Sequence, residues 1–259
     1  VLEEICFCAD YYDDVFVDKF KTSYVVKPDL IIFTSDEIDL AYKDFNQIIK
    51  EGLTFVDYFE SKRYYGLASD MLETIFLKID YVIAPQGILG AKLIEYKNLL
   101  YSNDALQTVV ANTKLKLQEL LSFDRQKFND SLFHPKFLVP IKKRGELPYI
   151  QEFMSKTFET MTASFGNKSY MDVTIAALFL IYDLFYKNAI PNEVTTHLES
   201  ALEKAGGKDW KTSAEILYGS VNKIMSLNPE EDASEQLTDD SSLASIKSIF
   251  GKITGLFKK

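Results

Sequence analysis

Residues 34–52, TSDEIDLAYKDFNQIIKEG, decide the fold class because they have the pattern of one amphipathic helix with a defined start. Thr34 and Glu37 have the spacing of a capping box, in which the threonine hydroxyl accepts a hydrogen bond from a backbone N–H and the glutamate reaches back. Gly52 is predicted to stop the helix, since glycine commonly follows the last periodic residue. The apolar residues between these signals recur at helical spacing: Ile38, Ala41, Tyr42, Phe45, Ile48 and Ile49.

The same periodicity recurs along most of the chain and predicts a predominantly α-helical protein. A second capping box, from Thr212 to Glu215, is expected to start the last helix of this series, and Gly206 with Gly207 to end the helix before it. The further helices are expected near residues 67–79, 88–100, 106–121, 149–161, 170–186, 192–205 and 213–225.

One of these predicted helices is much more apolar than the others. Residues 173–182 lie between Asp172 and Asp183 and contain no charged side chain. The run is well short of the roughly 18 to 20 residues needed to span a bilayer, so a buried core helix is predicted. A carboxylate on such a helix should be paired or protonated, and for Asp183 we expect a structural hydrogen bond rather than catalysis.

Short apolar runs in the N-terminal third also fit a different structure. Residues 4–10 (EICFCAD), 28–35 (PDLIIFTS) and 79–85 (IDYVIAP) each end at turn or loop residues, and LTFV at 53–56 is a fourth candidate strand. Strands that alternate with helices would form βαβ units, and therefore a small parallel sheet within residues 1–100. The alternative is that these runs belong to an all-α multi-helix bundle.

Breaks in the helical pattern divide the chain into five parts. Residues 1–121 are predicted to form a helix-rich domain, α/β if the strands are present, and residues 149–227 a helical domain. Between them, residues 122–148 contain three prolines and little periodicity, which is typical of an irregular connector. Residues 228–242 are predicted to be an acidic tether, and residues 243–259 a basic amphipathic helix.

Charge and cysteine content limit the classes of function. The net charge of −9 argues against general nucleic-acid binding, which requires a basic surface. Cys6 and Cys8 are too close in sequence for an unstrained disulfide, so a reducing compartment, the cytoplasm, is expected. The sequence lacks the common nucleotide-binding, hydrolase and zinc-protease motifs, and no cofactor is predicted.

A cluster of aspartates follows the first apolar run. If that run is a strand, Asp10, Asp13 and Asp14 lie near its carboxyl end, where carboxylates could bind Mg²⁺. If the segment is helical, Asp14 and Asp18 share one face, and their spacing resembles the aspartate-rich diphosphate-binding motif of isoprenoid synthases, without the second metal motif of that family. The cluster therefore offers an alternative function, a divalent-metal-dependent enzyme acting on a phosphorylated small molecule. The structural alternative is a solvated acidic surface.

The C-terminus separates acidic, basic and apolar residues most clearly. Residues 228–240 hold six acidic and no basic side chains, whereas residues 243–259 hold four lysines and no acid. In a helix, the apolar side chains of the second segment fall within an arc of about 140°. The residues expected to contact a membrane or a partner are Leu243, Ile246, Lys247, Ile249, Phe250, Lys252, Ile253, Leu256, Phe257, Lys258 and Lys259.

Together these features predict a non-enzymatic interaction or scaffold protein of the cytoplasm that can attach peripherally to a membrane. The terminal helix suits an anionic membrane surface, a groove of a protein partner, or a groove of its own domain. These three alternatives stay open. A protein partner is expected, and nucleic acid is not.

Overall fold

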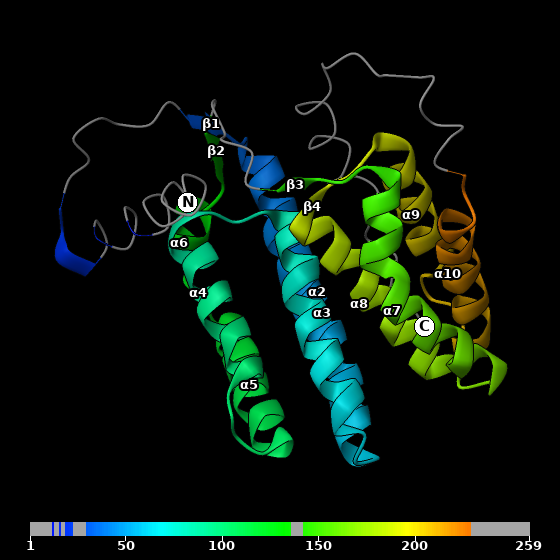
Figure 1. The fold of residues 1–259 in the computed structure, drawn as a ribbon. Helices are drawn as coiled ribbons and strands as arrows, with labels where there is room; N and C mark the ends of the chain where they lie inside the picture. The colour runs from blue at the N-terminus through cyan, green and yellow to red at the C-terminus, as the bar shows by residue number, and fades with distance from the viewer. Residues whose placement is uncertain (1–11, 13–15, 17–18, 23–29, 136–141, 229–259) are drawn as a thin grey trace. The chain divides into compact units, whose positions relative to one another are not determined.

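The computed structural model describes residues 12, 16, 19–22, 30–135 and 142–228, and the chain divides into two compact units (Figure 1). Unit 1 covers Val1–Ile141 and unit 2 covers Lys142–Lys259. Both units are built mainly from α-helices, so the predicted predominantly α-helical fold is confirmed.

Unit 1 is organised around one central helix, α3. This helix packs against α2, α4 and α5, and its residues 74–79 are all buried. A helix that is covered on every side has to be apolar almost all round, and Lys78 is the one charged residue in this stretch. The elements of unit 1 are β1 (Leu30–Ile32), α2 (Ser35–Ser61), α3 (Tyr65–Ile83), α4 (Gly87–Asn98), the 3₁₀ helix η1 (Leu99–Tyr101), α5 (Leu106–Leu120), α6 (Arg125–Asp130) and β2 (Phe133–Pro135).

The start of α2 confirms the predicted capping box. The Thr34 hydroxyl accepts from the Glu37 backbone N–H at 3.4 Å, and the Glu37 carboxylate accepts from the Thr34 backbone N–H at 2.8 Å. The predicted end at Gly52 is wrong, because α2 continues to Ser61. Residues 53–56, proposed as a strand, lie inside this helix.

Gly52 permits close helix packing instead of ending a helix. A Cβ atom built on Gly52 would lie 2.4 Å from both Cδ1 and Cγ1 of Ile75 on α3. That distance is far below van der Waals contact, so a residue without a Cβ lets α2 and α3 approach this closely.

Replacing Gly52 by alanine is therefore expected to destabilise unit 1 by about 1–3 kcal/mol, the usual cost of overpacking a core. Gly66→Ala is the matched control, because a Cβ at Gly66 meets nothing within 4 Å and alanine favours the helix. Denaturant unfolding of both variants measures the difference. Gly52→Ala should cost less in an Ile75→Ala background, and an unchanged cost there would contradict the packing explanation.

Helix replaces the predicted strand at residues 79–85. The central helix α3 continues through Ile83 and ends at Ala84, which has a left-handed conformation with φ 47°. Pro85 follows at once and cannot continue the helix. The apolar run is a sign of burial on α3, and burial alone does not distinguish helix from strand.

The short strands of unit 1 do not form the predicted parallel sheet. Residues 28–35 do contain β1, but β1 pairs antiparallel with β2, and Ile31 lies opposite His134. Among the described residues of unit 1 this pair is the whole of the strand structure, so the all-α alternative describes the unit better. Residues 4–10 lie outside the described part of the chain.

Unit 2 repeats the principle of one helix surrounded by three others. The central helix α8 packs against α7, α9 and α10, and its side chains from Val173 to Phe185 are nearly all buried. The predicted core helix is thereby confirmed. The elements of unit 2 are β3 (Lys143–Arg144), α7 (Leu147–Gly166), α8 (Tyr170–Lys187), β4 (Asn188–Ala189), α9 (Asn192–Ala205) and α10 (Trp210–Met225), with β3 and β4 paired in parallel.

The boundary between α9 and α10 matches the prediction in part. Gly206 is the C-cap of α9, as expected. The predicted capping box at Thr212 is wrong, because Asp209 caps α10 by accepting from the backbone N–H groups of Lys211 and Thr212. Aspartate is one of the strongest N-cap residues, and its use here starts the helix three residues earlier.

The predicted connector at residues 122–148 contains some regular structure. It includes α6, β2 and β3, and the division between the two units falls within it. The exact bounds of the domains stay a prediction.

Candidate functional site

The functional residues predicted from sequence lie outside the described part of the chain. This holds for the aspartates Asp10, Asp13 and Asp14 and for every residue of the segment 243–259. Within the described residues, no group of three or more His, Cys, Asp and Glu side chains is placed to hold a metal ion. No helix in that part of the chain is both long and apolar enough to cross a membrane.

A cluster of buried charged groups lies between α2 and α3. Lys78 on α3 is only 4% exposed, and Asp44 on α2 is 7% exposed. Asp44, Gln47 and Glu51 follow one stripe of α2, with spacings of three and four residues. The Gln47 side-chain amide donates to the Glu51 carboxylate at 2.7 Å, which fixes the position of that acid.

Burial dominates the electrostatics of this cluster. It lowers the pKa of Lys78 to about 8, against the opposing attraction of Glu51 and Asp44. Burial also raises the pKa of Asp44, which the charges of Lys43 and Lys78 oppose. An amine with a pKa near 8 could exchange a proton near neutral pH, but the Lys78 side chain is closed off from solvent. We therefore interpret the cluster as a polar contact that specifies how α2 and α3 pair.

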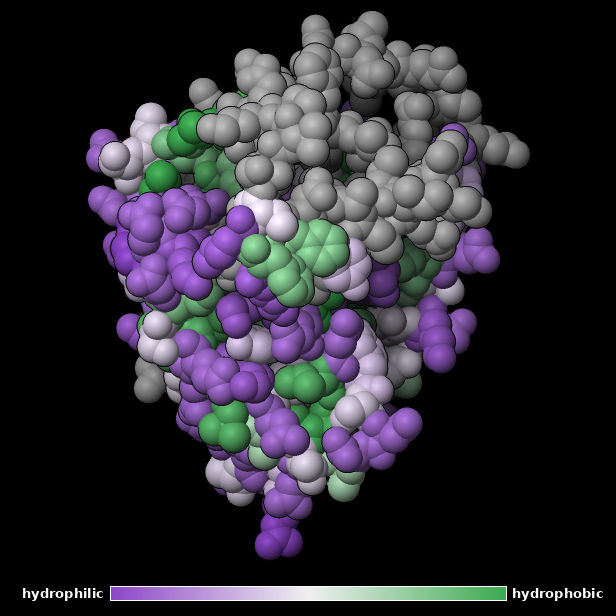
Figure 2. Space-filling view, turned by 90° about the vertical axis from the view of Figure 1, so that its left-hand side faces the viewer, coloured by the Kyte–Doolittle hydropathy of each residue, from purple (hydrophilic) through white to green (hydrophobic). Residues whose placement is uncertain are grey.

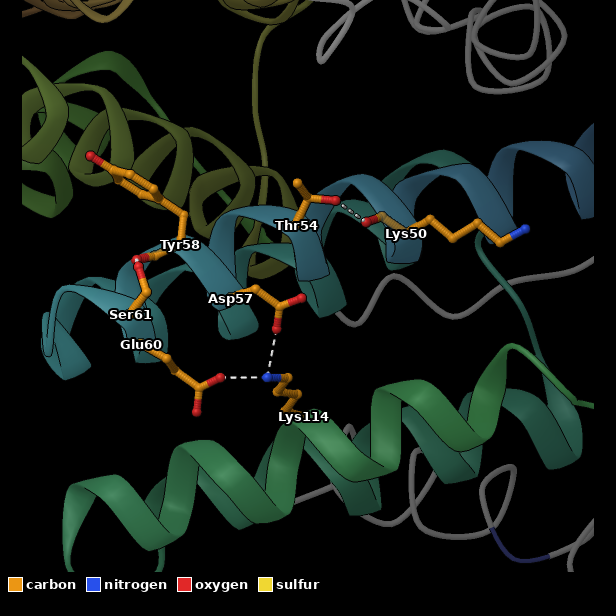
Figure 3. A network of polar contacts seen from close by, with 7 residues as sticks. All are labelled: Lys50, Thr54, Asp57, Tyr58, Glu60, Ser61 and Lys114. Atoms are coloured by element: carbon orange, nitrogen blue, oxygen red, sulfur yellow. Dashed lines mark hydrogen bonds and ion pairs between the residues drawn. The ribbon is translucent and has the colours of Figure 1, made fainter.

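A second polar network connects α5 to the end of α2 (Figure 3). The Lys114 ammonium lies 2.5 Å from Asp57 Oδ1 and 2.5 Å from Glu60 Oε2. Burial alone would lower the pKa of Lys114, but the hydrogen bonds to the two carboxylates outweigh it and raise the pKa. Figure 3 also shows that Tyr58 points away from α5, and the Ser61 hydroxyl donates to the Tyr58 carbonyl at 2.7 Å. The network joins two helices of unit 1.

Exposed apolar side chains near α5 are scattered. Tyr101 is 62% exposed, Leu106 45% and Leu115 56%. Leu106 and Leu115 are nine residues apart on α5 and so point to opposite sides of the helix. Figure 2, which views the side carrying α4 and α5, shows small apolar areas separated by hydrophilic residues. Such isolated apolar residues are normal on protein surfaces and do not define a binding site.

An aromatic stack joins α7 and α10 of unit 2. The ring of Tyr218 lies between Phe165, with centroids 4.6 Å apart, and Phe158, with centroids 5.6 Å apart. Both pairs are within 13° of parallel, and all three side chains are half-buried. The hydroxyls of Thr162 and Tyr218 lie 3.2 Å apart. Sequence reasoning missed this stack, and its one signal was the seven-residue spacing of Phe158 and Phe165 on a single helix.

The acid on the apolar helix α8 is paired, as predicted. Asp183 is 7% exposed, and its Oδ2 lies 2.8 Å from the ammonium of Lys187, one turn further along α8. Lys187 also lies over the ring of Phe153, 5.8 Å from its centroid. This geometry gives Asp183 a structural role.

Comparisons with protein families, with curated proteins and with solved structures find no match for this chain. Among the described residues, the stack on α7 and α10 joins two helices of unit 2.

Proposed function

We propose that the chain is a non-enzymatic interaction or scaffold protein whose C-terminal helix attaches it reversibly to an anionic membrane surface or to a protein partner. The observation that carries the proposal is the division of residues 243–259 into an apolar stripe and a lysine-bearing face. Phe250 and Phe257 lie within the stripe, and small or basic residues occupy the opposite side. This composition is typical of helices that lie in a membrane interface.

The energetics of this segment favour reversible attachment. Each lysine near an anionic leaflet contributes roughly 1 kcal/mol, and the phenylalanines add apolar area. Gly251 and Gly255 weaken the helix in isolation, so part of the binding free energy is used to order it. The acidic residues of 228–240 would be repelled by an anionic surface, which limits the contact to the terminal helix.

The remainder of the chain suits a scaffold. Each unit has its own buried central helix, α3 in unit 1 and α8 in unit 2. A body of this kind can stay folded whether or not the tail is attached. Attachment to a membrane can be tested more easily than attachment to a protein partner.

Reversing the charge of Lys252, Lys258 and Lys259 to glutamate should weaken binding to anionic vesicles by about 100-fold or more, because three contributions of roughly 1 kcal/mol are lost. Binding to neutral vesicles should change far less. Co-sedimentation with phosphatidylserine-containing and pure phosphatidylcholine vesicles at low salt measures both effects.

The matched control for this experiment reverses three exposed lysines of the helical units, Lys50, Lys62 and Lys204, and so produces the same net charge. This control should bind vesicles nearly as the wild type does. If the wild type ignores anionic vesicles at low salt, the membrane version is wrong and the protein partner becomes the version to test.

A further inference from the structure

The most exposed large apolar side chains of unit 2 lie at one end of it. Among the described residues of this unit, Tyr149 is 36% exposed and Leu227 is 40% exposed, and the other large apolar side chains are more buried. Tyr149 is in the first turn of α7, and Leu227 follows the last residue of α10 by two positions. The Gln151 side-chain amide on α7 donates to the Leu227 carbonyl at 2.9 Å, which holds these two parts of the chain together.

A basic segment reaches the same end of unit 2. Residues 142–144 are Lys, Lys and Arg, the one run of three basic residues in the sequence. The strand β3 lies within this run and pairs in parallel with β4, and α7 starts three residues after the run. The Lys142 ammonium donates to the Phe185 carbonyl at 2.8 Å, near the end of α8. The basic segment is therefore fixed to the body of unit 2, close to the first turn of α7.

We define the exit end as residues 142–149 with Leu227, because the chain continues from here toward residues 243–259. Its three basic residues stand against two exposed acids of this region, Glu146 and Glu193, so that a positive charge remains. Basic residues together with an exposed tyrosine and an exposed leucine are a composition that suits the interface of an anionic membrane.

The length of the tether keeps the exit end near any surface that the terminal helix binds. Residues 229–242 can span at most about 46 Å when fully extended, so the exit end lies no further than this from the helix. The six acids of these residues would be repelled by an anionic surface, so within residues 228–259 the contact is that of the terminal helix. The exit end then offers a second contact on unit 2, at a raised effective concentration.

We infer that the exit end is a second membrane contact, which turns this end of unit 2 toward an anionic surface once the terminal helix has attached. The inference rests on the proposed attachment of the terminal helix to a membrane and adds the orientation of unit 2. The exit end alone is too weakly charged to hold the chain on a membrane, but two weak contacts on one chain strengthen each other.

Co-sedimentation of the full chain with phosphatidylserine-containing vesicles at low salt tests the charged part of the exit end. Lys143→Gln with Arg144→Gln should weaken binding by about tenfold, because two cations near the anionic surface are lost. Binding to pure phosphatidylcholine vesicles should change far less. Circular dichroism melting curves check that the substituted protein stays folded.

The matched control removes the same charge from the opposite end of unit 2. Lys204→Gln with Lys208→Gln replaces two exposed lysines around the turn between α9 and α10. This turn is far from the exit end, because the Trp210 carbonyl at the start of α10 accepts from the Thr174 hydroxyl near the start of α8 at 3.3 Å, whereas α8 ends beside β4. The control protein should bind vesicles as the wild type does.

A fluorescence readout tests the orientation of unit 2 without removing any charge. Trp210 is the only tryptophan in the sequence and lies at the end opposite the exit end. On phosphatidylserine vesicles that contain brominated lipids, the emission of the wild type should stay unchanged. The added emission of Tyr149→Trp should be quenched, because its indole would lie at the membrane interface.

The possible outcomes separate this inference from the proposed function. If the wild type sediments with the vesicles and both glutamine pairs bind equally well, or if bromine quenches Trp210 and spares Tyr149→Trp, the second contact is refuted and the attachment helix is not. A wild type that does not sediment with these vesicles would refute the proposed membrane attachment, and the second contact with it.

Discussion

The wild-type chain is expected to gain about 3 kcal/mol of unfolding free energy relative to Lys78→Met as the pH rises from 7 to 10.5. Lys78 is 4% exposed on α3, and burial lowers its pKa from 10.5 to about 8 despite the attraction of Glu51 and Asp44. Below pH 8 the folded and unfolded chains both hold the proton, and the folded state bears the full cost of a buried ammonium group.

The sign of the effect follows from which state releases its proton first. Between pH 8 and 10.5, the folded chain has lost the Lys78 proton while the unfolded chain still holds it. The unfolded state therefore binds more protons in this window, and the stability of the folded state rises with pH. Methionine cannot titrate, so this part of the rise is absent from the variant.

Denaturant unfolding at a series of pH values measures the difference between the two proteins, which cancels the titration of groups common to both. Lys43→Met is the matched control, because Lys43 is exposed on α2 and also lies beside Asp44. The control should keep the wild-type pH dependence. Parallel stability curves for the wild type and Lys78→Met would contradict the description of Lys78 as a buried, charged amine.

The helices could be predicted from the sequence wherever an amphipathic pattern coincided with a local end signal. The capping box at Thr34 and the glycine after Ala205 are examples, because both act within a few residues of the chain. The prediction that Gly52 ends the first helix was wrong for a physical reason. Its role depends on Ile75 of another helix, and a contact across the core leaves no mark in the local sequence.

Apolar runs were the other source of error. Residues 53–56 and 79–85 have the composition of buried strands, but they lie in α2 and α3. A central helix is apolar on all sides and loses the periodicity that would distinguish it from a strand. The same property made residues 173–182 recognisable as a core helix, since the apolar run is too short to span a bilayer.

The aromatic stack and the buried charged cluster depend on tertiary structure more than the helices do. The stack of Tyr218 between Phe158 and Phe165 joins residues that are 60 and 53 positions apart, and the cluster around Lys78 joins two helices. Neither could be assembled from spacing within one element. The aspartates near Asp10 and the segment 243–259 lie outside the described residues, so their roles stay predictions.

The stripe of residues 243–259 is the central element of the proposed function. Phe250→Glu with Phe257→Glu places two charges in this stripe, and burying an unpaired charge costs more than the helix gains by attachment. Attachment should fall below detection, while the two helical units stay folded because the substituted residues lie beyond the last helix of the described chain.

Co-sedimentation of the full chain with phosphatidylserine-containing vesicles at low salt is the most direct test of this account. We predict that the wild type sediments with the vesicles and that the Phe250→Glu, Phe257→Glu protein stays in the supernatant with an unchanged circular dichroism melting curve. A double variant that still sediments with the vesicles, or one that loses its cooperative unfolding transition, would contradict the account.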